Sequence, residues 1–215
     1  MENVLPEEIN LEVIILNPFL TVWLHPKQTA RDMIDNKPLW FVFLLIAIGS
    51  FAAFGSGYIN SEFNDTMSIA ILVFISLFIG PIFGIIMMFI YGGVLYLCGK
   101  LLRGTGSFWD VFKAGSLTYI PSLITGFFYY LWMFLSPESY FSVYETSAFS
   151  FIVPLISFGL GIWSFVINIA ALSEAHRYSN WRAFFTLLIP TIIVVVFIIA
   201  IIAIVGIAFF SIFSG

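Results

Sequence analysis

The stretch MSIAILVFISLFIGPIFGIIMMFIYGGVLYLCG, residues 67–99, decides the fold because it carries no charged side chain. A helix needs roughly 20 apolar residues to cross a bilayer, so this stretch is long enough for one tilted or bent span. Four further apolar stretches repeat the signal, at residues 39–58, 112–135, 149–173 and 183–213. The sequence therefore predicts an all-α, polytopic membrane protein, with a five-span membrane domain over residues 39–215 and an N-terminal segment over residues 1–38.

The charged residues between these stretches alternate in sign along the chain. The connections with acidic residues alone carry Glu62, Asp65, Glu138 and Glu145. All eight basic residues fall on the other side of a five-span arrangement: Lys27, Arg31, Lys37, Lys100, Arg103, Lys113, Arg177 and Arg182. Short basic loops stay cytoplasmic, so the pattern predicts a multi-pass cell-membrane protein with its N-terminus in the cytoplasm and its C-terminus outside.

The composition independently indicates a membrane protein. Hydrophobic residues make up 61% of the chain, charged residues 9%, and the mean hydropathy is +1.07. A soluble domain has about 25% charged residues. The chain begins with acidic residues, where a cleavable signal peptide would have a basic start, so we expect the first span to act as an uncleaved insertion signal. With one cysteine, Cys98, no intrachain disulfide is expected.

Two short helices are expected before the first span, at residues 18–24 and 26–36, each starting with a proline. The second would place Ala30, Met33 and Ile34 on one face and the charged Lys27, Arg31 and Asp35 on the other. Such amphipathic helices suit the membrane interface, as does Trp23. Packing against the ends of the spans is an equal alternative. In either case Trp23 and the eight basic residues are the candidate lipid- or partner-binding side chains.

Proline and small residues mark candidate sites of helix packing or a cavity. Gly80, Pro81 and Gly84 interrupt the second stretch, which we expect to form one kinked span, because two re-entrant halves would spoil the charge pattern. Prolines recur in the later spans, at Pro121, Pro154 and Pro190. Small residues allow close helix approach in lipid. Besides Gly80 and Gly84, we expect close helix approach at Gly49, Ala53, Gly57, Gly159 and Gly161, either within the protein's own bundle or to a dimer or partner helix.

The spans offer little chemistry, since no ionisable residue lies well inside any of them. Such residues mark proton and ion pathways, so their absence argues against a proton-coupled carrier. Asn168 is the most polar deep residue, with Ser164 on part of the same face. An interhelical hydrogen bond or a substrate contact would explain Asn168. We expect no catalytic residue, cofactor, metal site, nucleotide or nucleic acid.

The connection RGTGS, residues 103–107, has the Gly-x-Gly of a phosphate loop but lacks the Gly-Lys-Ser/Thr and a preceding strand. Ser107 and Asp110 instead predict a capping box at the start of the next helix.

Several blocks together resemble bacterial YIP1-family membrane proteins. They are NPFLTVW at 17–23 with HPK at 25–27, GTGSF at 104–108 with YIPS at 119–122, and IWS at 162–164 followed by LSE at 172–174, SNWRA at 179–183 and Pro190. The resemblance implies a five-helix bundle with a cytoplasmic N-terminus. For eukaryotic relatives it implies vesicle trafficking with Rab GTPases, but their Asp-Leu-Tyr-Gly-Pro motif does not occur here. For bacterial members it implies little chemistry and, in some, an accessory role beside ABC-type export systems.

Three functions follow as hypotheses. The first is a non-enzymatic adaptor or assembly protein that binds other membrane proteins, possibly an ABC-type exporter, or associates with itself. The second is a small transporter or channel acting as an oligomer, which predicts a polar cavity near Asn168, Ser164 and Pro81. The third is a lipid-handling or membrane-shaping protein that uses its N-terminal helices.

Overall fold

The computed structural model describes residues 16–213, with side chains described as far as residue 204, and every regular element in that range is a helix. Five helical units are long and apolar enough to cross a membrane: Leu39–Tyr58, Ile69–Leu101, Phe108–Leu135, Ala148–His176 and Asn180–Ile204. The predicted all-α fold with five spans is therefore confirmed.

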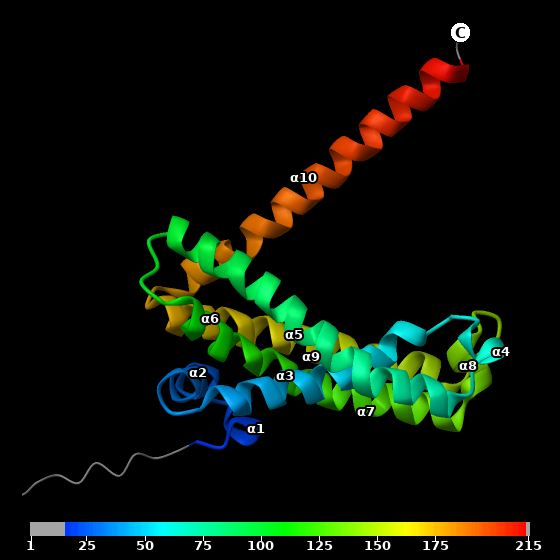
Figure 1. The fold of residues 1–215 in the computed structure, drawn as a ribbon, viewed down its shortest axis with the longest axis horizontal. Helices are drawn as coiled ribbons and strands as arrows, with labels where there is room; N and C mark the ends of the chain where they lie inside the picture. The colour runs from blue at the N-terminus through cyan, green and yellow to red at the C-terminus, as the bar shows by residue number, and fades with distance from the viewer. Residues whose placement is uncertain (1–15, 214–215) are drawn as a thin grey trace, which may run out of the picture.

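The elements follow one another with short connections. They are α1 (Pro18–Thr21), α2 (Pro26–Asp35), α3 (Leu39–Phe54), the 3-10 helix η1 (Gly55–Tyr58), α4 (Phe63–Thr66), α5 (Ile69–Leu101), α6 (Phe108–Gly115), the 3-10 helix η2 (Ser116–Thr118), α7 (Tyr119–Leu135), α8 (Pro137–Phe141), α9 (Ala148–His176) and α10 (Asn180–Phe213). Helices α3, α5, α7 and α9 run side by side, and α3 contacts both α5 and α7 (Figure 1). Helix α2 lies across one end of this bundle, and α4 and α8 lie at the other (Figure 1).

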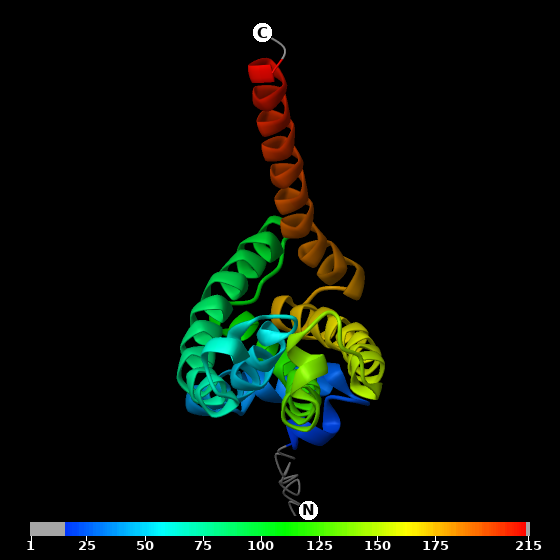
Figure 2. The same cartoon turned by 90° about the vertical axis from the view of Figure 1, so that its right-hand side faces the viewer.

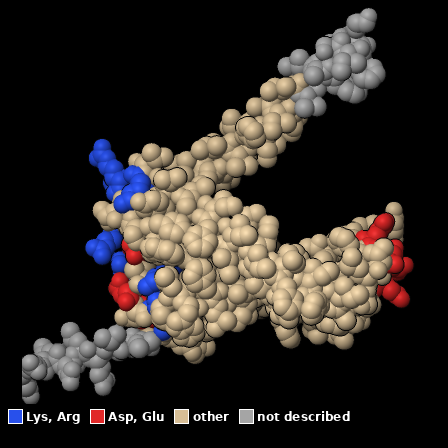
Figure 3. Space-filling model, viewed as in Figure 1, with Lys and Arg blue, Asp and Glu red and all other residues tan. Residues whose placement is uncertain are grey.

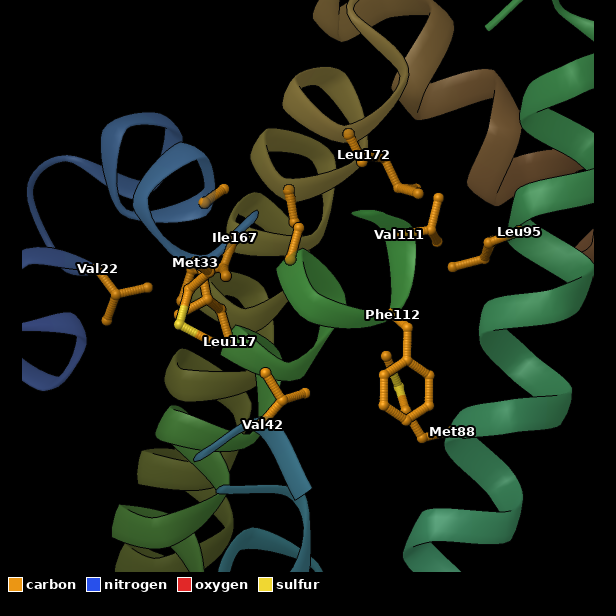
Figure 4. Packing of buried hydrophobic residues seen from close by; sticks show 14 of the residues in the cluster. Val22, Met33, Val42, Met88, Leu95, Val111, Phe112, Leu117, Ile167 and Leu172 are labelled. Carbon is orange, nitrogen blue, oxygen red and sulfur yellow. The ribbon is translucent and has the colours of Figure 1, made fainter. Parts of the chain in front are cut away.

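The main core lies at the end of the bundle that α2 covers. Met33 of α2, Val42 of α3 and Phe112 of α6 are completely buried there, together with Leu117 and Ile167 (Figure 4). The buried face of α2 also contains Thr29, Ala30 and Asp32. The apolar face expected for α2 therefore packs against α6 and α9, as the packing alternative requires.

A second core closes the opposite end around Tyr140 of α8. The Tyr140 hydroxyl donates to the carbonyl of Gly55, and the Tyr140 carbonyl accepts from the Asn60 amide at 3.0 Å. Trp132 donates to the Ser139 hydroxyl at 2.9 Å. Burial, together with neighbouring tyrosines, raises the pKa of Tyr140 above its ordinary value. These bonds tie the ends of α3 and α7 together.

The third span differs from the expected one at its start. It begins at Phe108 rather than at residue 112, and the 3-10 helix η2 interrupts it just before Pro121. Proline has no N–H to donate to the carbonyl four residues earlier, so the chain is released from regular α-helical bonding there. The expected capping box is confirmed, because the Ser107 side chain accepts from the Asp110 amide while the Asp110 carboxylate accepts from the Ser107 amide.

The first short helix also differs, since α1 ends at Thr21 and not at Leu24. The amide of His25 donates to the Thr21 carbonyl at 2.8 Å, which turns the chain into α2. Val22 is buried in this turn, whereas Phe19 is 41% exposed.

Helix α10 packs against the bundle over its first part and then leaves it (Figure 2). Ala183, Thr186 and Leu187 are buried, and α10 contacts both α5 and α9. From Ile192 to Ile204 every residue is exposed. Pro190 lies where the packing ends, and prolines bend helices by removing one backbone hydrogen bond. The two halves of α10 follow different directions, as Figure 2 shows.

Candidate functional site

The basic residues gather at one end of the bundle, which we call the basic face (Figure 3). They lie on or beside α2, at the end of α5, on α6, and around the turn between α9 and α10. The connections that carry Glu62, Asp65 and Glu138 lie at the opposite end (Figures 1 and 3). The structure thus separates the two groups of charges that alternate along the sequence.

Three of the candidate binding cations hold α2 in place. Arg31 donates two bonds to the Glu174 carboxylate, at 2.9 and 3.2 Å, and a third to the Glu174 carbonyl at 2.9 Å. Lys113 of α6 donates to the carbonyl of Ile34 at 2.9 Å, near the end of α2. Lys37 lies 3.4 Å from the Asp32 carboxylate. Arg31 and Lys113 therefore join α2 to α9 and α6, whereas Lys37 pairs at the end of α2 itself and donates to the Leu16 carbonyl at 2.9 Å.

The remaining basic side chains make few or no contacts with other described residues. Lys100 lies over the ring of Tyr96, 5.5 Å from its centroid. Within the described part of the chain, four side chains make no ion pair or hydrogen bond: Lys27, Arg103, Arg177 and Arg182. The basic face thus divides into cations that hold the fold together and cations that face outward.

The ion pair between Arg31 and Glu174 gives a testable prediction for the stability of α2 packing. Arg31→Gln is expected to lower the free energy of unfolding by about 1 kcal/mol, because charge-assisted bonds are lost from a partly exposed site. Thermal unfolding of the purified protein in mild detergent measures this. Arg182→Gln is the matched control and should leave the midpoint unchanged, while equal midpoints for both variants would contradict the assignment.

The connection at residues 103–107 is seated on the end of α9. The Thr105 amide and hydroxyl both donate to the carbonyl of His176, at 3.1 and 3.3 Å. A Cβ at Gly106 would overlap the Ala175 carbonyl, and one at Gly104 would overlap the His176 ring. The Gly-Thr-Gly sequence is therefore a packing motif in this structure.

Sequence reasoning did not find the buried position of His176. Its side chain is completely buried, between the rings of Tyr96 and Tyr178, whose centroids lie 6.4 and 5.2 Å away. Gly99 also approaches the ring closely. Burial raises the pKa of Tyr178, whose hydroxyl lies 2.6 Å from that of Thr186 on α10. Three glycines lie around His176: Gly99, Gly104 and Gly106. Their closeness in the sequence is the signal that points to a close approach of two chain segments.

The small residues in the spans fall into two groups. Gly49 and Gly84 face side chains that an added Cβ would overlap, Tyr119 and Ser50 respectively, and Gly80 lies against the backbone of α3. Gly57, Gly159 and Gly161 have nothing within 4 Å of an added Cβ, so they make no close helix contact within the described chain, and close approach of a partner helix there stays a prediction.

The candidate cavity residues are not all brought together. Gly80 and Gly84 line an apolar groove of about 650 Å³ beside Ser50 and Tyr119. Ser164 and Pro121 line a separate cavity of about 220 Å³, whose lining also includes other hydroxyl-bearing and small residues: Ala53, Ser56, Ser122, Thr125, Tyr129, Ser157 and Gly161. Pro81 and Asn168 line neither of them.

Asn168 makes an interhelical hydrogen bond. Its amide nitrogen donates to the Tyr91 hydroxyl at 3.0 Å, which joins α9 to α5. Ser164, one turn earlier, donates to the Thr118 carbonyl at 3.3 Å. Both polar side chains are thus engaged by neighbouring helices, and whether Asn168 also contacts a substrate stays a prediction.

The fold and the charge-divided ends define a polytopic α-helical membrane protein built from five spans. The model of the Yip1 domain matches residues 20–211, which is most of the chain. The chain therefore belongs to the Yip1 family. No curated protein and no solved structure matches it significantly.

Proposed function

We propose that this protein is a non-enzymatic membrane adaptor or assembly factor that binds another integral membrane protein. The observation that supports this most directly is the exposure of α10 beyond Pro190. Ile193, Phe197 and Ile199 are each at least 61% exposed. Ile193 and Phe197 lie one turn apart on one side of the helix, and Ile199 lies on the opposite side. From Ile192 to Ile204, α10 is exposed on every side, so all its faces there are free for a partner span.

The chemistry of the sequence favours binding over catalysis. Asp, Glu, Lys, Arg and His, the residues that mark ion pathways, occur only near the ends of the spans and not in their middle. Helix association in lipid depends on close packing and interhelical hydrogen bonds, for which an apolar span is sufficient. An ABC-type export system is the partner class that the resemblance to bacterial members of the family suggests. Lys27, Arg103, Arg177 and Arg182 supply cations for a contact at the basic face.

Photo-crosslinking in cells tests the adaptor proposal. A photoreactive amino acid is placed at Phe197 or Ile199 of α10, and at Phe158 of α9 as the control. Phe158 is 69% exposed and equally apolar, but it lies on a helix that packs within the bundle. We expect one membrane protein to be crosslinked from both α10 positions and identified by mass spectrometry, and not from Phe158.

The other outcomes of this experiment separate the alternatives. Crosslinks to the protein itself would replace the adaptor by a self-associating protein. Crosslinks of equal yield from Phe158 would mean random collision and would remove the support from α10. Recovery of lipid adducts alone would overturn the proposal.

A small transporter is the second candidate, because a cavity with several hydroxyl groups lies inside the bundle beside Ser164 and Pro121. Solute flux into proteoliposomes tests it. Thr125→Val should abolish flux through this cavity, while Thr191→Val, which also removes a hydroxyl bonded to its own helix, should leave flux intact.

We further propose that the protein lies in the cell membrane and that its basic face is cytoplasmic, so that its N-terminus is inside. In a Cys98→Ser background, Thr146→Cys is expected to react with an impermeant maleimide from outside intact cells. Ser179→Cys should react only after lysis. Both positions are exposed, one between α8 and α9 and the other between α9 and α10. The reverse labelling pattern would refute this orientation.

A further inference from the structure

A cavity of about 700 Å³ opens at the basic face between α2, α9 and the start of α10. It lies where the turn before α2 meets the two helices, and none of the functions above makes use of it. Its lining is divided. The turn and first residues of α2 supply the polar His25, Lys27 and Gln28, beside the apolar Leu24 and Pro26. Apart from Asn180 at the start of α10, the side chains from α9 and α10 are apolar or aromatic.

The apolar wall extends toward the middle of the membrane. Val166 and Ile169 of α9 face Phe184 of α10 across the cavity lining. Val166 lies ten residues before His176, the last residue of α9, which is about 15 Å along a helix. Trp181, 73% exposed, lies at the start of α10 on the same cavity. Tryptophan favours the boundary between hydrocarbon and water, so the wall runs from that boundary inward.

The polar part of the lining carries an unpaired positive charge. Lys27 and Gln28 are exposed and line the cavity together with His25. Lys27 makes no ion pair with a described residue, whereas Arg31, one turn later on α2, is bound to Glu174. Glu174 is therefore already neutralised by Arg31. The charge available at this cavity is positive, and it calls for an anion.

We propose that this cavity binds one anionic phospholipid from the leaflet at the basic face. The phosphate lies against Lys27 and Gln28, and an acyl chain lies along Val166, Ile169 and Phe184. This occupant fits because the anion-binding and apolar parts follow one another in the direction in which a lipid's headgroup and tail do. A soluble anion would leave the apolar wall uncovered. A zwitterionic lipid has a phosphate that its own cation balances, so the net positive charge of Lys27 would remain uncompensated.

Native mass spectrometry of the full-length protein in mild detergent tests the proposal. The probes are phosphatidylglycerol, which is anionic, and phosphatidylcholine, which carries no net charge. We expect one phosphatidylglycerol to remain bound in preference to phosphatidylcholine. Lys27→Gln should reduce that preference about fivefold, which corresponds to the attraction of one basic residue for an anionic lipid. Val166→Trp, which fills the apolar wall, should reduce the retention of both lipids.

The matched control is Arg103→Gln, which removes an equally exposed and unpaired cation at the basic face but outside the cavity. It should leave the preference unchanged. An equal loss in this variant would show diffuse attraction and overturn the proposal, as would the absence of a preference in the unaltered protein. Glycerol 3-phosphate binding as tightly as the lipid would also overturn it, because the apolar wall would then contribute nothing.

Discussion

Gly126→Ala is expected to lower the free energy of unfolding by about 1–3 kcal/mol, the cost of forcing extra volume into a packed interior. Gly126 of α7 lies directly against Ala52 of α3, and an added Cβ would come well within 3.0 Å of the Ala52 carbonyl group. The backbone of Ala52 cannot rotate out of the way of the added methyl group, as a flexible side chain could. The two helices would have to separate where α3 and α7 cross, near the centre of the bundle.

Gly159→Ala is the matched control, because Gly159 also lies within a span but has nothing within 4 Å of an added Cβ. Alanine favours the helix over glycine by roughly 0.5–1 kcal/mol, so this variant should be unchanged or slightly more stable. Thermal unfolding followed by size-exclusion chromatography in mild detergent measures both. A loss of stability as large in Gly159→Ala as in Gly126→Ala would contradict the assigned contact.

Gly106→Ala is expected to displace the connection between α5 and α6 from the end of α9. The added Cβ would overlap the carbonyl of Ala175, and the two bonds from Thr105 to the His176 carbonyl would be lost with the displacement. We expect a cost of about 2 kcal/mol or more, from steric overlap and from the broken hydrogen bonds. His176 would then lose the glycine backbone that covers it.

Limited trypsin digestion reports this displacement locally. Arg103 is exposed beside the seated connection, so cleavage after Arg103 should be faster in Gly106→Ala than in the unaltered protein. Gly93→Ala in α5 is the control, since nothing lies within 4 Å of its added Cβ. Unchanged cleavage in Gly106→Ala, with an unchanged unfolding midpoint, would mean that the connection accommodates the methyl group and is not tightly seated.

The sequence predicted the spans and the capping box because these depend on residues close together in the chain. Hydrophobicity over about 20 residues reveals a span, and Ser107 and Asp110 are three residues apart. The family resemblance was also readable, because it depends on the order of short blocks. The alternation of charge predicted correctly that the basic residues would lie at one end of the bundle (Figure 3).

What the sequence did not reveal depends on residues that meet only in the folded bundle. All eight cations were equivalent candidates, yet Arg31 is paired with Glu174, 143 residues away. Gly126 and Gly159 are both glycines within spans, but only the first lies against another helix. The same holds for Asn168, whose bond to Tyr91 joins helices that are distant in the chain. Which helices cross at which residue is decided by packing, and periodicity carries no information about it.

The pairing of Arg31 with Glu174 also has a consequence for biogenesis. When the first span enters the membrane, Glu174 has not yet been synthesised, so with the basic face cytoplasmic, as we propose, Arg31 would act at that moment as a free positive charge that helps to orient the chain. Once α9 has been inserted, the same side chain becomes an internal tie. Exchanging the two residues would preserve the ion pair in the finished bundle but replace a positive charge with a negative one in the segment that is oriented first. In the proposed orientation, one residue thus serves insertion and architecture in succession.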